Sequence, residues 1–225
     1  MNEYWHTPKT MPQSAKNQLS TLAQGAVVAV LTNELGEQVP LLKVSGAVFS
    51  QVFALNREYL FRGDFTAPVT ENAYAESDNY LTQNGLAGFA VTKDGWLVSL
   101  FSNQPWRGFA KLVAPYIPKH ATKLECLTTQ PYAQCALAQM YAKRFGFKLV
   151  AETVDDEAAM RQHYGDAFVD EFVQCNGQPH HLFMVRTPAA LPAVQKFTDY
   201  WAAYDYVNSL LPKGKLSCIL AGDGV

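Results

Sequence analysis

Runs of apolar residues separated by polar turns predict both strands and helices along this chain. Short runs rich in β-branched and aromatic residues predict strands over Ala26–Leu31, Pro40–Leu55 with a break at Gly46, Leu86–Thr92, Trp96–Ser102, Lys123–Thr129, Phe147–Val154 and His180–Thr187. Longer segments with capping residues at their ends predict helices over Ser14–Gln24, Thr70–Gly85, Trp106–Ile117, Tyr132–Gly146, Asp155–Phe168 and Pro192–Leu211. The mixture of the two kinds of element predicts a protein of the α/β class.

The clearest local signal is a hairpin in the middle of the chain. Asp94 and Gly95 separate two apolar runs, and an Asp-Gly pair in that position is typical of a tight hairpin turn. From Leu86 onward this hairpin is followed by alternating helices and strands. That order predicts a mixed, mostly antiparallel central sheet flanked by helices.

The domain organisation follows from composition shifts near the two ends. Residues 1–13 are polar and contain two prolines, so we expect a flexible lead-in. Residues 14–190 form the predicted α/β domain, and residues 191–225 form a C-terminal helical extension. Phe197, Trp201, Tyr204 and Leu211 fall roughly on one face of that helix, which predicts a core contact or a homodimer contact.

Composition narrows the class of protein. Of the 225 residues, 48% are hydrophobic and 17% are charged, which predicts a folded chain rather than a disordered one. Eighteen basic and 20 acidic residues give a net charge of −2, which argues against a globally basic nucleic-acid binder. The four cysteines are widely spaced, and no apolar run has the length of a signal peptide core or a membrane span. We therefore expect a cytoplasmic protein that does not insert into a membrane.

The segment from Ser99 to Leu112 carries the main candidate for ligand chemistry. A predicted strand runs through a turn with a glycine into a predicted helix, and free N–H groups at such a turn suit a phosphate. Gly108 and Ala110 lack bulk, and Arg107 adds positive charge. An ordinary strand-to-helix turn remains the alternative interpretation.

Two short motifs in the second half of the chain resemble the GNAT family of N-acetyltransferases. Residues 106–110 read Trp-Arg-Gly-Phe-Ala after a strand, and residues 144–148 read Arg-Phe-Gly-Phe-Lys where a helix meets the next strand. Residues 177–184 look like the last strand of a branch of the family often met in phage and prophage contexts. The resemblance covers roughly Leu86–Thr187.

The resemblance implies a GNAT-like fold and acetyl-CoA as the cosubstrate. It implies that the loop after the strand wraps the coenzyme pyrophosphate and that the end of the strand polarises the acyl carbonyl. Cys135 stands where the family has an asparagine. The implied coenzyme-binding residues are Leu100, Phe101, Ser102, Arg107, Gly108, Phe109, Ala110 and Cys135.

The resemblance also implies where proton transfer takes place. The family's tyrosine, which acts as a general acid toward the coenzyme thiolate, is matched here by Ala142, and Tyr141 lies one position away. Glu125 is the candidate base, because the strand Trp96–Ser102 contains no carboxylate. The alternative for Glu125 is a solvent-facing or structurally paired glutamate.

Other polar residues give weaker signals. Cys135 has no histidine placed near it by the sequence, and Cys126 lies in the middle of a predicted strand, so both are expected to be buried, small apolar side chains rather than nucleophiles. His180 and His181 are adjacent on a predicted strand and so face opposite sides of it. They therefore predict no metal site.

Three functions remain open at this point. The first is an acyl-CoA-dependent N-acetyltransferase that transfers an acetyl group to a small-molecule or protein amine by direct attack on the thioester. The second is a non-catalytic GNAT-fold structural or interaction protein, which Pro105 and Ala142 favour because they depart from the family motifs. The third is a GNAT-fold enzyme that modifies a nucleic-acid base, against which the near-neutral charge speaks.

Overall fold

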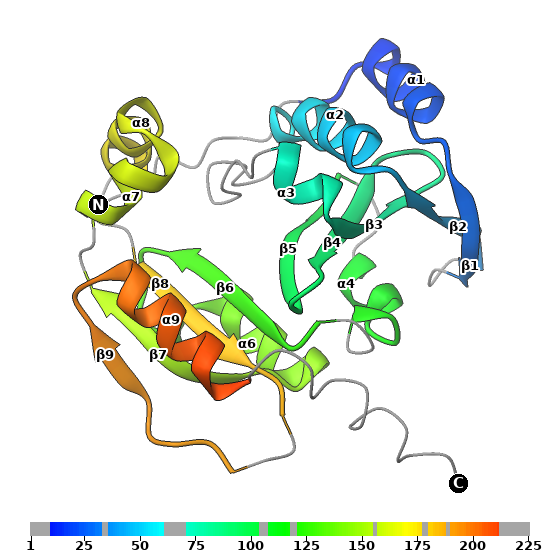
Figure 1. Cartoon of the computed structure of the whole chain (residues 1–225). Coiled ribbons are helices and arrows are strands. Elements are labelled where there is room, and N and C mark those ends of the chain that lie inside the picture. The colour runs from blue at the N-terminus through cyan, green and yellow to red at the C-terminus, as the bar shows by residue number, and fades with distance from the viewer. Residues whose placement is uncertain are drawn as a thin grey trace, which may run out of the picture. The chain divides into compact units, whose positions relative to one another are not determined.

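The computed structural model of the chain divides into two compact units, Met1–Pro115 (unit 1) and Tyr116–Val225 (unit 2). The structure describes residues 10–32, 36–60, 71–103, 108–117, 121–154, 157–176, 180–187 and 190–211 (Figure 1). Each unit combines strands with helices, so the predicted α/β class is confirmed.

In its described residues, unit 1 combines antiparallel strands with helices. Its elements are α1 (Gln13–Leu22), β1 (Ala26–Thr32), β2 (Gln38–Val44), α2 (Gly46–Arg57), α3 (Glu71–Ala75), β3 (Ser77–Thr82), β4 (Ala87–Thr92), β5 (Trp96–Ser102) and α4 (Phe109–Val113). The strands follow one another in the order β1-β2-β3-β4-β5, each antiparallel to the next. The β4–β5 pair with its turn at Gly95, where φ is +90°, is the predicted hairpin.

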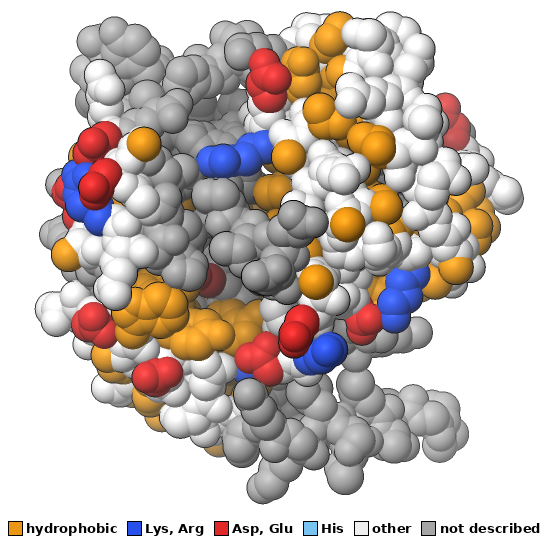
Figure 2. Space-filling model, turned by 45° about the horizontal axis from the view of Figure 1, so that its top comes forward, with side chains coloured by type: hydrophobic (Ala, Val, Ile, Leu, Met, Phe, Trp, Pro, Cys, Tyr) orange, Lys and Arg blue, Asp and Glu red, His pale blue; other side chains and the backbone are white. Residues whose placement is uncertain are grey.

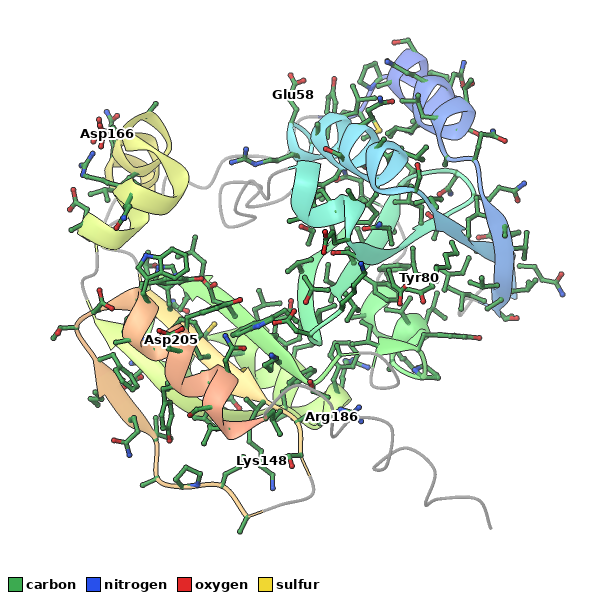
Figure 3. All side chains as sticks on the ribbon, viewed as in Figure 1. Glu58, Tyr80, Lys148, Asp166, Arg186 and Asp205 are labelled. Atoms are coloured by element: carbon green, nitrogen blue, oxygen red, sulfur yellow. The ribbon has the colours of Figure 1, made fainter. Side chains whose placement is uncertain are left out.

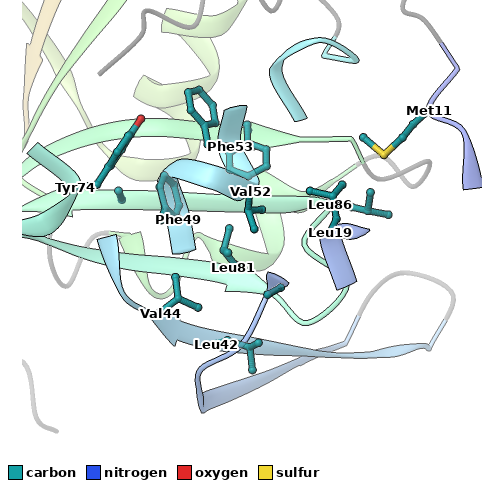
Figure 4. Close-up of a cluster of buried hydrophobic side chains, with 13 residues drawn as sticks. Met11, Leu19, Leu42, Val44, Phe49, Val52, Phe53, Tyr74, Leu81 and Leu86 are labelled. Atoms are coloured by element: carbon teal, nitrogen blue, oxygen red, sulfur yellow. The ribbon is translucent and has the colours of Figure 1, made fainter. Parts of the chain in front are cut away.

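An aromatic cluster forms the core of unit 1 (Figure 4). Phe49 and Phe53 from α2 pack against Tyr74 and against Phe101 of β5, with ring centroids 4.9 to 6.3 Å apart. Leu19 of α1 is fully buried in the same cluster. Burial of these large apolar side chains is the main stabilising contribution in this unit.

The segment Gly46–Leu55, predicted as strand, is a helix. Ser45 caps α2 by accepting a hydrogen bond from the backbone N–H of Val48 at 3.3 Å. Phe49, Val52 and Phe53 face the core at helical spacing. The β-like composition misled the prediction, because a periodicity near 3.6 decides over the propensity of single residues.

The predicted helix Thr70–Gly85 is wrong over most of its length. Only α3 is helical there, and the chain then continues as β3, which lies between β2 and β4. The Ser77 hydroxyl donates to the carbonyl of Ala73 at 2.6 Å, and the Asn79 amide donates to the carbonyl of Tyr74 at 2.8 Å. These bonds satisfy carbonyls where the helix ends, and pairing with two strands overrides local propensity.

Unit 2 also combines strands with helices in its described residues. Its elements are β6 (Lys123–Thr128), the 3-10 turn η2 (Tyr132–Gln134), α6 (Ala136–Phe145), β7 (Lys148–Val154), α7 (Glu157–Tyr164), α8 (Asp166–Asn176), β8 (His180–Val185), β9 (Gln195–Phe197) and α9 (Tyr200–Leu210). The strand order is β6-β8-β7-β9, antiparallel except for the parallel pair β7–β9. Gly146 ends α6 with φ +72°, as the sequence predicts.

Two predicted helices of unit 2 differ from the observed elements. The segment expected as Asp155–Phe168 is the pair α7 and α8, separated by Gly165 at φ +82°. The segment expected as Pro192–Leu211 begins with β9 and is helical only as α9, which Asp199 caps. The buried side of α9 carries Tyr200, Ala203 and Val207, whereas Trp201 is 37% exposed.

The mostly antiparallel strands flanked by helices, with an added C-terminal helix, are therefore confirmed and are consistent with a GNAT-like architecture. Within the described ranges, no helix has both the length and the apolar content needed to cross a bilayer. On the face shown in Figure 2, hydrophobic side chains gather in patches, and Lys and Arg lie scattered among acidic residues.

Candidate functional site

The predicted acyl-binding strand, β5, contains a bulge. Gly88 pairs with Phe101 and Ala90 pairs with Val98, so Phe89 alone lies opposite Ser99 and Leu100. Ser99 adopts φ +56°, a left-handed conformation that side-chain-bearing residues rarely take. A bulge places one extra residue on β5 and disrupts the regular ladder with β4 at this point.

The Ser99 side chain is hydrogen-bonded to Tyr74, a buried residue in the core of unit 1. Its hydroxyl lies 2.5 Å from the hydroxyl of Tyr74, and either group can donate. Burial raises the pKa of Tyr74 to about 12, so the phenol keeps its proton at neutral pH. The strained backbone at Ser99 is thus held by a hydrogen bond to a side chain in the rigid aromatic cluster.

A second anchor fixes the chain directly after β5. The side-chain amide of Asn103 donates to the backbone carbonyl of Asn56 at 3.0 Å and to its side-chain oxygen at 2.9 Å. Asn56 is fully buried, and its own amide donates to the carbonyls of Val52 and Gly85 at 2.8 Å each. The hydrogen bonds between Asn103 and Asn56 therefore fix the position of the chain just before the predicted phosphate loop.

The predicted coenzyme-binding residues of unit 1 differ in exposure. Phe101 and Phe109 are buried in the apolar interior, Leu100 and Ala110 are half-buried, and Ser102 is exposed. Gly108 precedes α4 with φ +116°, and a Cβ atom there would meet nothing within 4 Å. The backbone at Gly108 is therefore open to a ligand, while Arg107 lies outside the described residues.

Glu125, the candidate base, lies on β6 of unit 2 and is held by two partners. One carboxylate oxygen is hydrogen-bonded to Nδ1 of His181 on β8, and the other accepts from the hydroxyl of Tyr200 on α9 at 2.7 Å. The Glu125 side chain is 19% exposed, whereas His181 is fully buried. Among the described residues, Nε2 of His181 has no hydrogen-bond partner. A carboxylate in this place fixes the orientation of the imidazole ring.

Cys135 and Tyr141 lie on the other side of unit 2. The residue after Glu125 on the strand, Cys126, points to the opposite face, where its sulfur lies 3.9 Å from that of Cys135. The Cys135 sulfur caps α6 by accepting from the N–H of Ala138 at 3.5 Å. Tyr141 is buried on the inner side of α6, and burial together with the two nearby sulfurs raises its pKa.

The structure thus separates the two predicted catalytic residues. Glu125 faces α9, whereas Tyr141 comes with Cys126 and Cys135 on the α6 side of the strands. Arg186, labelled in Figure 3, directly follows β8, and burial lowers its pKa. Sequence reasoning missed four partners that only the fold reveals: Tyr74, Ser99, His181 and Tyr200.

Comparisons with known proteins add no relative. No family model, no curated protein and no solved structure matches this chain. The resemblance to GNAT enzymes therefore rests on the motifs in the sequence, and the function has to be argued from the geometry.

Proposed function

We propose that the chain is an acyl-CoA-dependent N-acetyltransferase that binds acetyl-CoA through β5 and the start of α4. The observation that carries this proposal is the bulge at Ser99 and Leu100. A non-glycine residue in a left-handed conformation costs about 1–3 kcal/mol and is found most often where function requires it. Here the strain lies in the strand that precedes the predicted phosphate loop.

The bulge and the glycine suit two parts of the same ligand. A main-chain N–H at the disrupted ladder would donate to the acyl carbonyl oxygen, on which negative charge develops as the amine attacks. The open backbone at Gly108 lets a pyrophosphate approach main-chain N–H groups. A strand-end donor followed by an open glycine turn is the arrangement that a thioester with a long phosphorylated carrier requires.

The proposed reaction is direct attack of an amine on the thioester. The amine nitrogen attacks the thioester carbon, the C–N bond forms, the C–S bond breaks, and the coenzyme thiolate leaves. The attacking amine gives up its proton to a base, and the thiolate takes up a proton from solvent.

Ligand binding tests this proposal directly. Acetyl-CoA at about millimolar concentration raises the melting temperature of the wild-type chain by ligand linkage. Gly108→Asp removes that shift, because its side chain brings bulk and negative charge to the phosphate position. Gly36→Asp is the matched control, since Gly36 also has a positive φ, +78°, with no atom near its Cβ.

Comparing Gly108→Asp with Gly36→Asp distinguishes a loss of stability caused by backbone strain from a loss of coenzyme binding. Both carry a side chain in a left-handed conformation, so both lose a similar amount of intrinsic stability. The proposal predicts that only the Gly36 variant keeps the coenzyme shift. A wild-type chain that shows no shift with acetyl-CoA contradicts the proposal, and an unchanged shift in Gly108→Asp moves the site elsewhere.

A non-catalytic interaction protein is the second candidate, and β1 favours it. Val27, Val28 and Val30 are 60%, 46% and 52% exposed on this strand, which pairs with β2 at the end of the strand order of unit 1. β1 contains no charged residue to discourage pairing with another strand. The occupant we assign is β1 of a second copy, because two identical uncharged edges can pair antiparallel without repulsion.

Sedimentation of the full chain tests the second candidate. It predicts a concentration-dependent dimer that Val30→Lys weakens at least tenfold, because the added charges oppose each other at the shared edge. Leu137→Lys is the control, since Leu137 is 44% exposed on α6. A wild-type monomer at all concentrations, or equal weakening by both variants, contradicts pairing through β1.

A further inference from the structure

Two cysteines that are nine residues apart in the sequence come together inside unit 2. Cys126 lies within β6 and Cys135 lies at the N-terminal end of α6, with their sulfur atoms 3.9 Å apart. Both are free thiols, and both residues are at least 96% buried. A disulfide has an S–S distance of about 2.0 Å, so the two sulfurs need to approach by about 2 Å to form one.

The two thiols are chemically unequal. The Cys135 sulfur accepts hydrogen bonds from the Ala138 N–H and from the Cys126 thiol, which stabilise the thiolate and lower the pKa of Cys135. The Cys126 thiol lies deeper in the strand, and its pKa is raised by the interaction with Cys135 and by burial. One sulfur is therefore prepared to attack an oxidant, and the other holds a proton beside it.

Cys135 is buried, but the chain around it lies at the surface. The residues next to it in the chain, Gln134 and Ala136, are both exposed, and η2 is a single short 3-10 turn. Short surface turns with few buried side chains open more readily than strands do. A small oxidant can therefore reach the Cys135 sulfur through motion of this turn without unfolding the strands.

We propose that Cys126 and Cys135 form a reversible oxidation site that a hydroperoxide converts into an intramolecular disulfide. This inference does not depend on acyltransferase activity.

The reaction balances in two steps. The Cys135 thiolate attacks one oxygen of hydrogen peroxide, the O–O bond breaks, and a proton from solvent completes one water as Cys135 becomes a sulfenic acid. The Cys126 sulfur then attacks the Cys135 sulfur, the S–O bond breaks, and the Cys126 proton leaves with the hydroxyl as a second water. The two thiols are oxidised by two electrons, and the peroxide is reduced.

The disulfide ties the start of α6 to β6. It closes a ring that contains η2, and it places the crosslink beside the buried Tyr141. A crosslink that restricts the unfolded chain raises the thermal stability of the oxidised form, and a thiol reductant reverses the change. We therefore expect oxidation to immobilise this turn.

Mass spectrometry of the full-length protein tests the proposal in a single peptide. Trypsin cleaves after Lys123 and after Lys143 and at no residue between them, so the peptide 124–143 contains both cysteines and neither Cys175 nor Cys218. Oxidation of the folded, reduced protein by hydrogen peroxide converts most of this peptide into a form that lacks two hydrogen atoms and resists alkylation. Dithiothreitol restores both alkylation sites.

Two variants keep the test decisive. Cys135→Ser retains a capping residue for α6, and its Cys126 stays reduced under the same oxidation. Cys126→Ala oxidises at Cys135 to a sulfenic acid that dimedone traps, and it forms no disulfide. The proposal is overturned if folded wild-type protein keeps two alkylatable thiols in peptide 124–143, or if Cys126 oxidises equally fast without Cys135.

Discussion

The two units bury different kinds of side chain. Among the described residues of unit 1, the buried polar side chains are those of Asn56, Asn79 and Thr82, which are neutral and hydrogen-bond next to an aromatic cluster. In unit 2 the buried polar residues include the ionisable side chains of Lys123, Glu152 and His181. Buried ionisable groups are costly and occur often at functional sites, so these three residues mark unit 2 as the place to look for proton transfer.

The features that set unit 1 apart from unit 2 are not ionisable side chains. Its unusual features are a bulge in β5 and an open glycine before α4, and both are properties of the backbone. Their geometry depends on the aromatic core behind β5. The unusual features described in unit 1 are therefore in the main chain, whereas those described in unit 2 are in ionisable side chains.

The largest expected effect comes from breaking the core of unit 1. Phe49→Ala removes a fully buried ring that contacts Phe53, Tyr74 and Phe101, and we expect it to lower the free energy of unfolding by about 3–5 kcal/mol. Urea unfolding measures the loss, and Val30→Ala is the control because Val30 is exposed. A loss below about 1 kcal/mol would contradict the role given to this cluster.

The next effect tests the buried carboxylate of unit 2. Glu125→Leu leaves His181 and the Tyr200 hydroxyl without their acceptor, which we expect to lower the free energy of unfolding by about 2–3 kcal/mol. Glu125→Gln keeps an acceptor oxygen for Tyr200 and restores part of the loss. Chemical denaturation of the two variants measures the difference. If both variants were as stable as the wild type, the buried Glu125 carboxylate would not contribute to the stability of unit 2.

A smaller effect isolates the backbone strain in β5. Ser99→Ala and Ser99→Gly both remove the hydroxyl that bonds to Tyr74, but only glycine relieves the positive φ. We therefore expect Ser99→Gly to be more stable than Ser99→Ala by about 1 kcal/mol. Thermal unfolding followed by circular dichroism compares the pair. A glycine variant less stable than the alanine variant would show that Ser99 is not strained.

The smallest expected effect is a nearly flat pH profile at Cys135. Its lowered pKa, about 5, makes the thiolate the main form from pH 6 to pH 8, so the alkylation rate changes less than twofold over that range. An ordinary thiol of pKa about 8.5 loses roughly a hundredfold in rate between pH 8 and pH 6. Iodoacetamide labelling of peptide 124–143 in Cys126→Ala tests whether Cys126 causes the lowering, because the profile then becomes steep. A steep profile in the wild type would contradict the lowered pKa.

Much of the fold was predictable because local patterns agree with tertiary pairing. The hairpin at Asp94 and Gly95, the strand β6 and the helix α6 each carry their own boundary signals in the sequence. The secondary-structure predictions were wrong where the local sequence pattern and the tertiary pairing favour different elements. Gly46–Leu55 has the composition of a strand and the spacing of a helix, and β3 is a strand only because β2 and β4 pair with it.

The site was predictable only in part. The sequence could nominate Gly108 and Glu125, because a glycine before a helix and a carboxylate on a strand are visible as residues. It could not show the bulge at Ser99, which exists only relative to the register of β4. The same holds for His181 and Cys126, whose partners come from other elements across the strands.

The buried amide of Asn56 has a consequence for the kinetics of the chain. Its partners Gly85 and Asn103 lie 29 and 47 residues away, so we expect these bonds to form only after β3, β4 and β5 have assembled. Interactions that form late in folding chiefly slow the reverse reaction. We therefore expect the hydrogen bonds of Asn56 to lower the unfolding rate more than they raise the folding rate.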